Sequence, residues 1–235
     1  MKATSTLLGL VCVVQFAFAQ GFFSVHSPNG VDVWAVGKQG AIWRSYNGGV
    51  TWSATQQGAQ DLRGVASVGT NVWIVGESGA AYRSTNAGGT WSPMATGWTQ
   101  SLRAVEFPTP LHGWIAGQAG LILRTTDGGT SWTGQTSGTT QHLNALAFMD
   151  SLVGYAAGDN GVLLKTVNGG LTWTAVNDPS WRAHLTAVAV RGQTVHVTGL
   201  DAFCARSDNA GTSWVLLNFN TDSKSDVTGV YMLSE

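Results

Sequence analysis

The sequence predicts an all-β protein, a β-propeller of five four-stranded antiparallel blades. The pattern Ser/Thr-x-Asn/Asp-x-Gly-x-Ser/Thr-Trp occurs five times, and its copies end at Trp52, Trp91, Trp132, Trp173 and Trp214. The closing tryptophans lie 39, 41, 41 and 41 residues apart, and a constant period of this length is typical of solenoids and propellers. Each repeat also holds four short apolar or alternating runs, the content of one propeller blade.

The third repeat shows the four expected strands in order. Residues 102–107 alternate, 113–117 are largely apolar, and 121–125 and 131–135 follow. Runs of this length, separated by glycine-rich turns, are typical of strands. We therefore expect each repeat to fold as a small antiparallel sheet.

The residue types of the octapeptide fit the hairpin between the third and fourth strands. Asn and Asp accept hydrogen bonds from nearby amides and tolerate left-handed backbone, and Gly adopts it without steric cost. The tryptophan offers a large apolar surface that fixes the fourth strand. We interpret the recurring asparagines as structural, neither catalytic nor metal-binding.

A second recurring element, Gly-x-x-Gly, joins the second and third strands. It begins at Gly37, Gly76, Gly117 and Gly158. A dinucleotide fingerprint would need a helix after it, so the blade period indicates tight turns instead. The fifth copy, Gly199-Leu200-Asp201-Ala202, departs from the pattern and predicts a slightly different turn.

The first 19 residues predict a secretory signal peptide rather than part of the fold. A basic Lys2, an apolar stretch over 7–18 and the Ala17-Phe18-Ala19 cleavage motif have the expected order. We predict export, with a lipid-modified Cys12 as the alternative, and one propeller domain over 20–235. Removing this segment leaves Cys204 as the lone cysteine, expected as a buried small hydrophobe.

Composition excludes several classes of partner. The formal net charge is −1 and 11% of residues are charged, which argues against a nucleic-acid footprint or a polybasic membrane patch. The mature chain has no segment suited to span a bilayer, and we expect no cofactor and no metal.

The repeat resembles a known family. The octapeptides resemble Asp-boxes, or bacterial neuraminidase repeats, and the fuller unit in 102–132 is similar to the photosystem II stability and assembly factor-like β-propellers. The resemblance covers almost all of 22–231 and implies radially arranged blades. It also implies an assembly chaperone that binds membrane-protein intermediates through an arginine-rich face. Only Arg63 and Arg103 match that arginine position; Phe23, Asn144, Thr186 and Thr228 stand there in the other copies.

The blade topology predicts which end of the blades carries the binding face. In a meandering blade, the octapeptide turns share one end with the turns between first and second strands. The Gly-x-x-Gly turns share the other end with the connections between blades, and these connections hold the residues that break the pattern. The candidate binding face comprises Arg63, Trp98, Arg103, His142, Trp181, Arg182 and His184. Exposed aromatics with arginines are enriched at binding hot spots; the alternative, that each tryptophan packs on its own loop, stays open.

We therefore expect an exported, non-catalytic module that binds a protein partner, with a glycan as a second class of ligand. The alternative is a sialidase-type exo-glycosidase or a carbohydrate-binding propeller. A sialidase needs an arginine cluster, a Tyr–Glu pair and an acid, and Glu77, Glu106 and Glu235 are the only glutamates. None of them has a tyrosine at a suitable repeat position, and no catalytic residue is predicted.

A further first strand is expected over 227–232, where the sequence matches the start of a repeat. Two interpretations remain open. This strand closes a five-bladed ring beside the N-terminal strand, or it begins a sixth blade, so that the chain is a fragment of a larger propeller.

Overall fold

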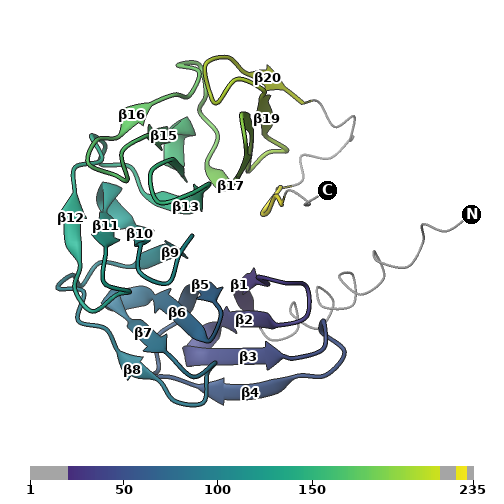
Figure 1. The fold of residues 1–235 in the computed structure, drawn as a ribbon. Coiled ribbons are helices and arrows are strands. Elements are labelled where there is room, and N and C mark those ends of the chain that lie inside the picture. The colour runs from purple at the N-terminus through teal and green to yellow at the C-terminus, as the bar shows by residue number, and fades with distance from the viewer. Residues whose placement is uncertain (1–20, 218–225, 232–235) are drawn as a thin grey trace, which may run out of the picture. The chain divides into compact units, whose positions relative to one another are not determined.

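The computed structural model describes residues 21–217 and 226–231 (Figure 1). It contains five four-stranded antiparallel sheets, each with its strands in sequence order. These are the blades of a β-propeller, the predicted fold class. The predicted signal peptide lies outside the described residues. Among the described residues, no helix is long and apolar enough to span a membrane.

The strand bounds follow the predicted repeat. The first sheet contains β1 (Phe22–His26), β2 (Val33–Gly37), β3 (Ala41–Ser45) and β4 (Ser53–Gln56). The second contains β5 (Leu62–Val68), β6 (Asn71–Gly76), β7 (Ala81–Ser84) and β8 (Ser92–Pro93). The third contains β9 (Leu102–Glu106), β10 (Gly113–Gly117), β11 (Ile122–Thr125) and β12 (Thr133–Gln135). The fourth contains β13 (Leu143–Phe148), β14 (Gly154–Gly158), β15 (Leu163–Thr166) and β16 (Thr174–Ala175). The fifth contains β17 (Leu185–Arg191), β18 (Thr194–Gly199), β19 (Cys204–Ser207) and β20 (Val215–Leu216).

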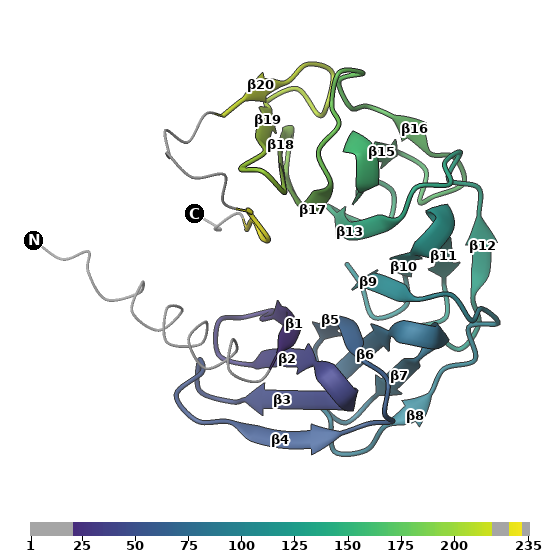
Figure 2. The same cartoon turned by 180° about the vertical axis from the view of Figure 1, so that it is seen from behind.

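The chain divides into two compact units, one ending at Leu102 and one starting at Arg103. The first holds two blades and the second three, with β9 starting at the boundary. Figure 2 shows from behind that the strands follow one another from β1 to β4 in the first sheet. That 20–235 form one domain stays a prediction.

Apolar side chains from successive sheets form the core within each unit. In the first unit, Trp34, Val36 and Ile42 of the first blade pack with Leu62 and Ile74 of the second. In the second unit, the same kind of cluster lies between the third and fourth blades and between the fourth and fifth. The middle strand β14 is buried at every residue, because both faces of this sheet are covered.

The octapeptide is a closed hydrogen-bonded turn, as its residue types predict. Asn47 Oδ1 accepts from the Thr51 amide at 2.8 Å, and Ser45 Oγ accepts from the Gly49 amide at 2.8 Å. Asp127 makes the same contact with the Ser131 amide at 2.9 Å. Hydrogen bonds from the Ser131 hydroxyl and amide hold the pKa of Asp127 well below its usual range. The asparagines are structural.

Both ends of the blade are arranged as the topology predicts. The turn between first and second strands meets the octapeptide: the Gly169 amide donates to the Leu152 carbonyl at 2.8 Å. At the other end, the Gly161 amide donates to the Ala183 carbonyl of the connection at 2.7 Å. We call these the octapeptide end and the GxxG end of each sheet.

Basic residues that precede the octapeptides join one blade to the next, consistent with repeat architecture. Arg44 donates to the carbonyl of Ala87 in the second blade and lies over the ring of Trp34. Lys165 Nζ donates to the Ala210 carbonyl of the fifth blade at 2.9 Å.

The GxxG turns are tight, and the glycine at their fourth position is required. Its φ is near +72° in all four copies. A Cβ at Gly120 would lie 1.9 Å from the Thr139 carbonyl oxygen. The preceding residue is left-handed as well, although Gln39, Ser78, Ala119 and Asn160 carry side chains.

The fifth turn is slightly different, as the sequence predicts: each of the first four turns contains a 3-10 helix, and residues 200–202 form none. Asp201 and Ala202 have φ of 56° and 58°, and the Phe203 amide donates to the Leu200 carbonyl at 3.2 Å. The Ala80, Leu121 and Val162 amides make the equivalent bond in other blades. The fifth turn therefore keeps the left-handed pair and the closing hydrogen bond, and alanine occupies a glycine position.

The segment 226–231 was expected to contain a strand, and the structure assigns none to these residues. It does contact the fifth blade as an inner strand would. The Val227 amide donates to the Gly199 carbonyl at 3.1 Å, and Asp226 Oδ1 accepts from the Asp201 amide at 3.1 Å. Met232 lies outside the described residues, and closure and truncation both stay open.

Candidate functional site

The candidate site lies at the GxxG ends of the sheets, where each blade brings an inner strand, a left-handed turn and a connection together. The residue before the inner strand accepts a hydrogen bond from the turn of the preceding blade. Asp61 Oδ1 accepts from the Gln39 amide at 2.9 Å, and His142 Nδ1 accepts from the Ala119 amide at 3.0 Å. Asp226 makes the same contact with Asp201. His142 is therefore partly a structural cap.

In the first unit, the predicted residues are Arg63 and Trp98. The Arg63 guanidinium pairs with Glu77 and lies 3.8 Å from Asp61 Oδ2. It also covers the Phe23 ring, 3.9 Å from the ring centroid. This arginine is thus neutralised by carboxylates of its own blade.

Trp98 is half-buried on the connection that leads to the third blade. Its carbonyl oxygen lies against Gly79, where a Cβ would be 2.2 Å away. Its amide donates to Thr96 Oγ1 at 3.4 Å. The backbone of Trp98 is therefore held in place while part of its side chain remains exposed.

In the second unit, four polar side chains from three blades form one network. Arg103 on β9 donates to Asn144 Oδ1 on β13. Asn144 Nδ2 donates to Asp159 Oδ1 at 2.8 Å and to the Leu185 carbonyl at 2.9 Å. His184 Nδ1 lies 3.2 Å from the same Asp159 oxygen.

Asp159 stays ionised at the centre of this network. Burial raises its pKa, but the hydrogen bonds from Asn144 and His184 and the charges of His184 and Arg103 outweigh burial, so the pKa is lowered. The His184 side chain is 53% exposed while that of Asp159 is 17% exposed. The carboxylate therefore orients an imidazole that is about half-exposed.

Arg182 is exposed beside this network. Its guanidinium donates to the carbonyls of Pro179 and Trp181, both at 2.7 Å. No carboxylate pairs with it in the described part of the chain. Its positive charge is therefore available to a ligand.

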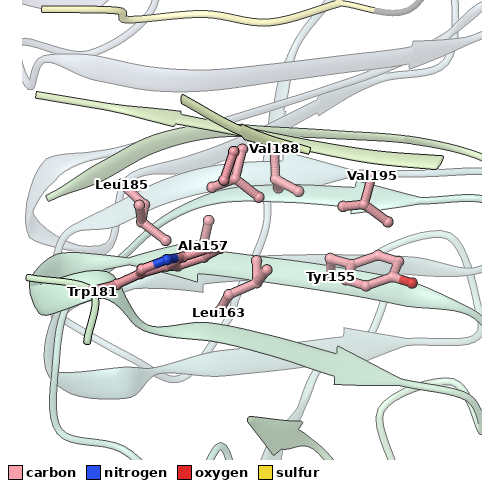
Figure 3. Packing of buried hydrophobic residues seen from close by; sticks show 9 residues of the cluster. Tyr155, Ala157, Leu163, Trp181, Leu185, Val188 and Val195 are labelled. Carbon is pink, nitrogen blue, oxygen red and sulfur yellow. The ribbon is translucent and has the colours of Figure 1, made fainter. Parts of the chain in front are cut away.

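Trp181 was expected as an exposed anchor, and this expectation is wrong. The side chain is 4% exposed and packs edge-on against Phe203 and Trp214, with ring centroids 5.0 Å apart in both pairs. Figure 3 shows the indole beside Ala157, Leu163 and Leu185 between the sheets. Ala205 of the fifth blade belongs to the same cluster. Trp181 is therefore structural, but it packs between the fourth and fifth blades rather than on its own connecting loop, as the alternative had it.

Sequence reasoning missed Asn144 and Asp159 as members of the site. Asn144 stands at the arginine position of its inner strand, and Asp159 follows the first glycine of its turn. The repeat pattern could have indicated both residues. It places Asn144 and Asp159 at the same end of the fourth blade, and it places His184 at the corresponding end of the next blade. Among the described residues, no group of three His, Cys, Asp or Glu side chains is placed to hold a metal.

Comparison with known proteins supports the fold. No protein-family model matches the chain, and no curated protein matches it. Among solved structures, it is similar to YCF48 bound to D1 peptide, with 20% identity, a TM-score of 0.68, and coverage of 84% of this chain and 67% of the other. It is also similar to YCF48 from Cyanidioschyzon merolae, with 19% identity, a TM-score of 0.61, and coverage of 80% of this chain and 69% of the other. A third similar structure is the GH74 enzyme of Niastella koreensis, with 19% identity, a TM-score of 0.69, and coverage of 83% of this chain and 38% of the other.

These similarities confirm the fold expected from the resemblance to the photosystem II assembly factor-like propellers. The chain spans about two thirds of the YCF48 chains and well under half of the GH74 enzyme. The neighbours include both a peptide-binding protein and glycoside hydrolases, so fold similarity alone does not choose between binding and catalysis.

Proposed function

We propose that this protein is an exported, non-catalytic propeller that binds a protein partner through the GxxG ends of its blades. The observation that carries the proposal is the network of Arg103, Asn144, Asp159 and His184. It holds polar groups from three blades in fixed positions beside the exposed Arg182. Pre-organised polar groups lose little conformational entropy on binding.

Two further points support a protein partner. One structural neighbour is YCF48 in complex with a peptide of D1, so this fold can bind a polypeptide. Each unit also exposes a residue of this kind at a GxxG end: Trp98 of the first unit is half-exposed, and Arg182 of the second is exposed and donates only to backbone carbonyls among the described contacts. Both residue types are enriched where partners bind tightly. The Leu7–Phe18 stretch and its cleavage motif favour a partner outside the cytoplasm.

The similarity to GH74 enzymes favours a second candidate, glycoside hydrolysis or glycan binding. Hydrolysis needs a protonated carboxylic acid beside an ionised one. Asp159 is a poor proton donor because its pKa is lowered. Glu106 has a pKa raised to about 7 by burial, but it lies at the last residue of β9, away from the GxxG end of its blade.

The test combines capture with an activity assay. The mature protein should retain a specific polypeptide from the exported fraction of its source and should not hydrolyse a panel of fluorogenic glycosides and xyloglucan oligosaccharides. Turnover that disappears in Asp159→Asn would contradict the proposal. Loss of capture in His184→Ala, with an unchanged melting temperature, would support it.

A further inference from the structure

The chain contains four Asn-Gly pairs, the dipeptide in which asparagine deamidates most readily. They begin at Asn29, Asn47, Asn160 and Asn168. In deamidation the glycine amide nitrogen attacks the side-chain carbon of the asparagine, and glycine has no Cβ to obstruct that approach. The product carries a carboxylate in place of an amide, so the modification adds a negative charge. The contacts of each pair decide which asparagine can react in the folded protein.

The two pairs within octapeptides are held against this reaction. The Gly48 amide donates to the Val31 carbonyl at 2.8 Å. The Asn47 side chain is held at both atoms, since Oδ1 accepts from the Thr51 amide at 2.8 Å and Nδ2 donates to Thr51 Oγ1 at 2.9 Å. The pair that begins at Asn168 has the same set of contacts. Attack would break hydrogen bonds of both the nitrogen and the side chain.

The pair in the GxxG turn of the fourth blade is held as well. The Gly161 amide donates to the Ala183 carbonyl at 2.7 Å, and Asn160 Nδ2 donates to Gln141 Oε1 at 2.8 Å. Gly161 is buried, and a Cβ on it would lie 2.5 Å from Cβ of Trp181. This turn has no room to rearrange.

Asn29 differs because only its own turn holds it. Residues 27–32 connect β1 and β2, and Asn29 and Gly30 are both exposed. The Gly30 amide donates to Ser27 Oγ at 3.0 Å, and no atom lies within 4 Å of the place of a Cβ on Gly30. The hydrogen bonds described for these two residues all stay within 27–32. The pair can therefore change its geometry without disturbing the sheet.

The polar groups of this turn favour the attack. Asn29 Oδ1 accepts from the amides of Val31 and Asp32 at 2.9 and 2.8 Å. These two donors stabilise the negative charge that develops on Oδ1 when the side-chain carbon is attacked, as an oxyanion hole does. Ser27 Oγ accepts the Gly30 N–H, which is the proton that the attacking nitrogen must lose.

We propose that Asn29 is the deamidation site of the folded protein. The Gly30 nitrogen forms a bond to Cγ of Asn29 and loses its proton, the bond between Cγ and Nδ2 breaks, and Nδ2 takes up a proton and leaves as ammonia. Water then opens the resulting succinimide ring at either carbonyl and gives aspartate or isoaspartate. The net reaction consumes one water and releases one ammonia, with no oxidation or reduction.

The new carboxylate would lie beside an existing one. Asn29 Nδ2 is 3.0 Å from Asp32 Oδ2, and Asp32 pairs with Arg44 at 3.2 Å. Arg44 in turn donates to the Ala87 carbonyl of the second blade. Deamidation would thus add negative charge at the octapeptide end of the first blade, a place separate from the GxxG ends assigned to the proposed function.

Peptide mapping by mass spectrometry tests this proposal. The folded protein is kept at pH 8 and 37 °C, and samples are digested with trypsin at pH 6. The tryptic peptide that ends at Lys38 contains Asn29 as its only asparagine, and peptide 45–63 contains Asn47 as its only one. We expect the first peptide to convert from amide to acid about tenfold faster than the second, because its turn opens without unfolding of the blade. In oxygen-18 water the product should carry the label.

Urea-unfolded protein is the matched control. Without the folded contacts the two peptides should convert at rates within about twofold of each other, since both contain Asn-Gly. Fragmentation of the remaining peptides locates any conversion at Asn160 and Asn168. The proposal is overturned if one of the other three asparagines converts as fast as Asn29 in the folded protein. It is also overturned if Asn29 stays unconverted while the unfolded chain reacts.

Discussion

At the scale of single residues, two kinds of position behave differently from what their chemical type suggests. The tryptophans of the connections look equivalent in sequence, but Trp181 is buried in the core and Trp98 is half-exposed. The left-handed turn residues look like a glycine motif, but side chains occupy several of those positions. Both differences predict measurable effects on stability.

Replacing Trp181 by alanine should destabilise the protein by about 3–4 kcal/mol, because it removes a buried indole that contacts Phe203 and Trp214. Trp98→Ala should cost about 1 kcal/mol or less, since part of that side chain is already in water. Urea denaturation of both variants measures the difference. Equal losses would mean that the two tryptophans have the same structural role.

Ala202→Gly should stabilise the protein by roughly 0.5–1 kcal/mol. The left-handed φ of 58° costs alanine about 1–2 kcal/mol, and part of that gain is offset by the larger chain entropy of glycine when unfolded. Gly120→Ala is the matched opposite change and should destabilise strongly, since its Cβ would meet the Thr139 carbonyl. A lower melting temperature for Ala202→Gly would show that this turn is not strained.

At the scale of the strand, β9 ends in an ionisable residue, Glu106, where other inner strands have alanine. Glu106 closes β9, at a position where Ala66 and Ala147 stand in the second and fourth blades. Its side chain is only partly exposed at the end of this strand. Burial raises its pKa from 4.5 to about 7, so the folded protein favours the neutral acid.

This shift makes stability pH-dependent. Between pH 4.5 and about 7, Glu106 holds its proton in the folded state and loses it in the unfolded state. The free energy of unfolding is therefore highest below pH 4.5 and falls as the pH rises through 7. Glu106→Gln should therefore be more stable than the unaltered protein at pH 8, by on the order of 2 kcal/mol. At pH 5 the gain should shrink to less than half. Thermal denaturation at both values tests this, and a gain independent of pH would exclude titration of Glu106 as the cause.

Much of this element scale could be predicted from the sequence. The strand 113–117 and the placement of the two kinds of turn at opposite ends of each blade follow from periodicity. The constant octapeptide spacing shows where each strand of a repeat begins and ends. The burial of Trp181 could not be predicted, since it depends on packing against Phe203 and Trp214 of the next repeat. Likewise, the network around Asp159 joins residues from different repeats, and periodicity within one repeat does not show such contacts.

At the scale of the whole molecule, each blade has two ends with different chemistry. The GxxG ends carry hydrogen-bonded polar groups, among them Asp159 and His184, while the octapeptide end of blade four carries exposed aliphatic residues. The sequence predicts binding at the GxxG ends only, because the residue types of the recurring octapeptides are explained by the turn that they form. Only the exposure of individual side chains shows that the octapeptide end also varies from blade to blade.

The central claim is that a protein partner binds at the GxxG ends, and its most direct test is a titration of the captured partner. Isothermal calorimetry would compare the unaltered protein with His184→Ala, Arg182→Ala and the blade-four variant Val167→Thr, Leu171→Thr, all checked for unchanged melting temperature. We expect the first two variants each to lose at least tenfold in affinity, since they remove an exposed imidazole and an exposed guanidinium that has no carboxylate partner among the described residues. The third variant should bind normally. Undiminished affinity in both His184→Ala and Arg182→Ala would contradict the account.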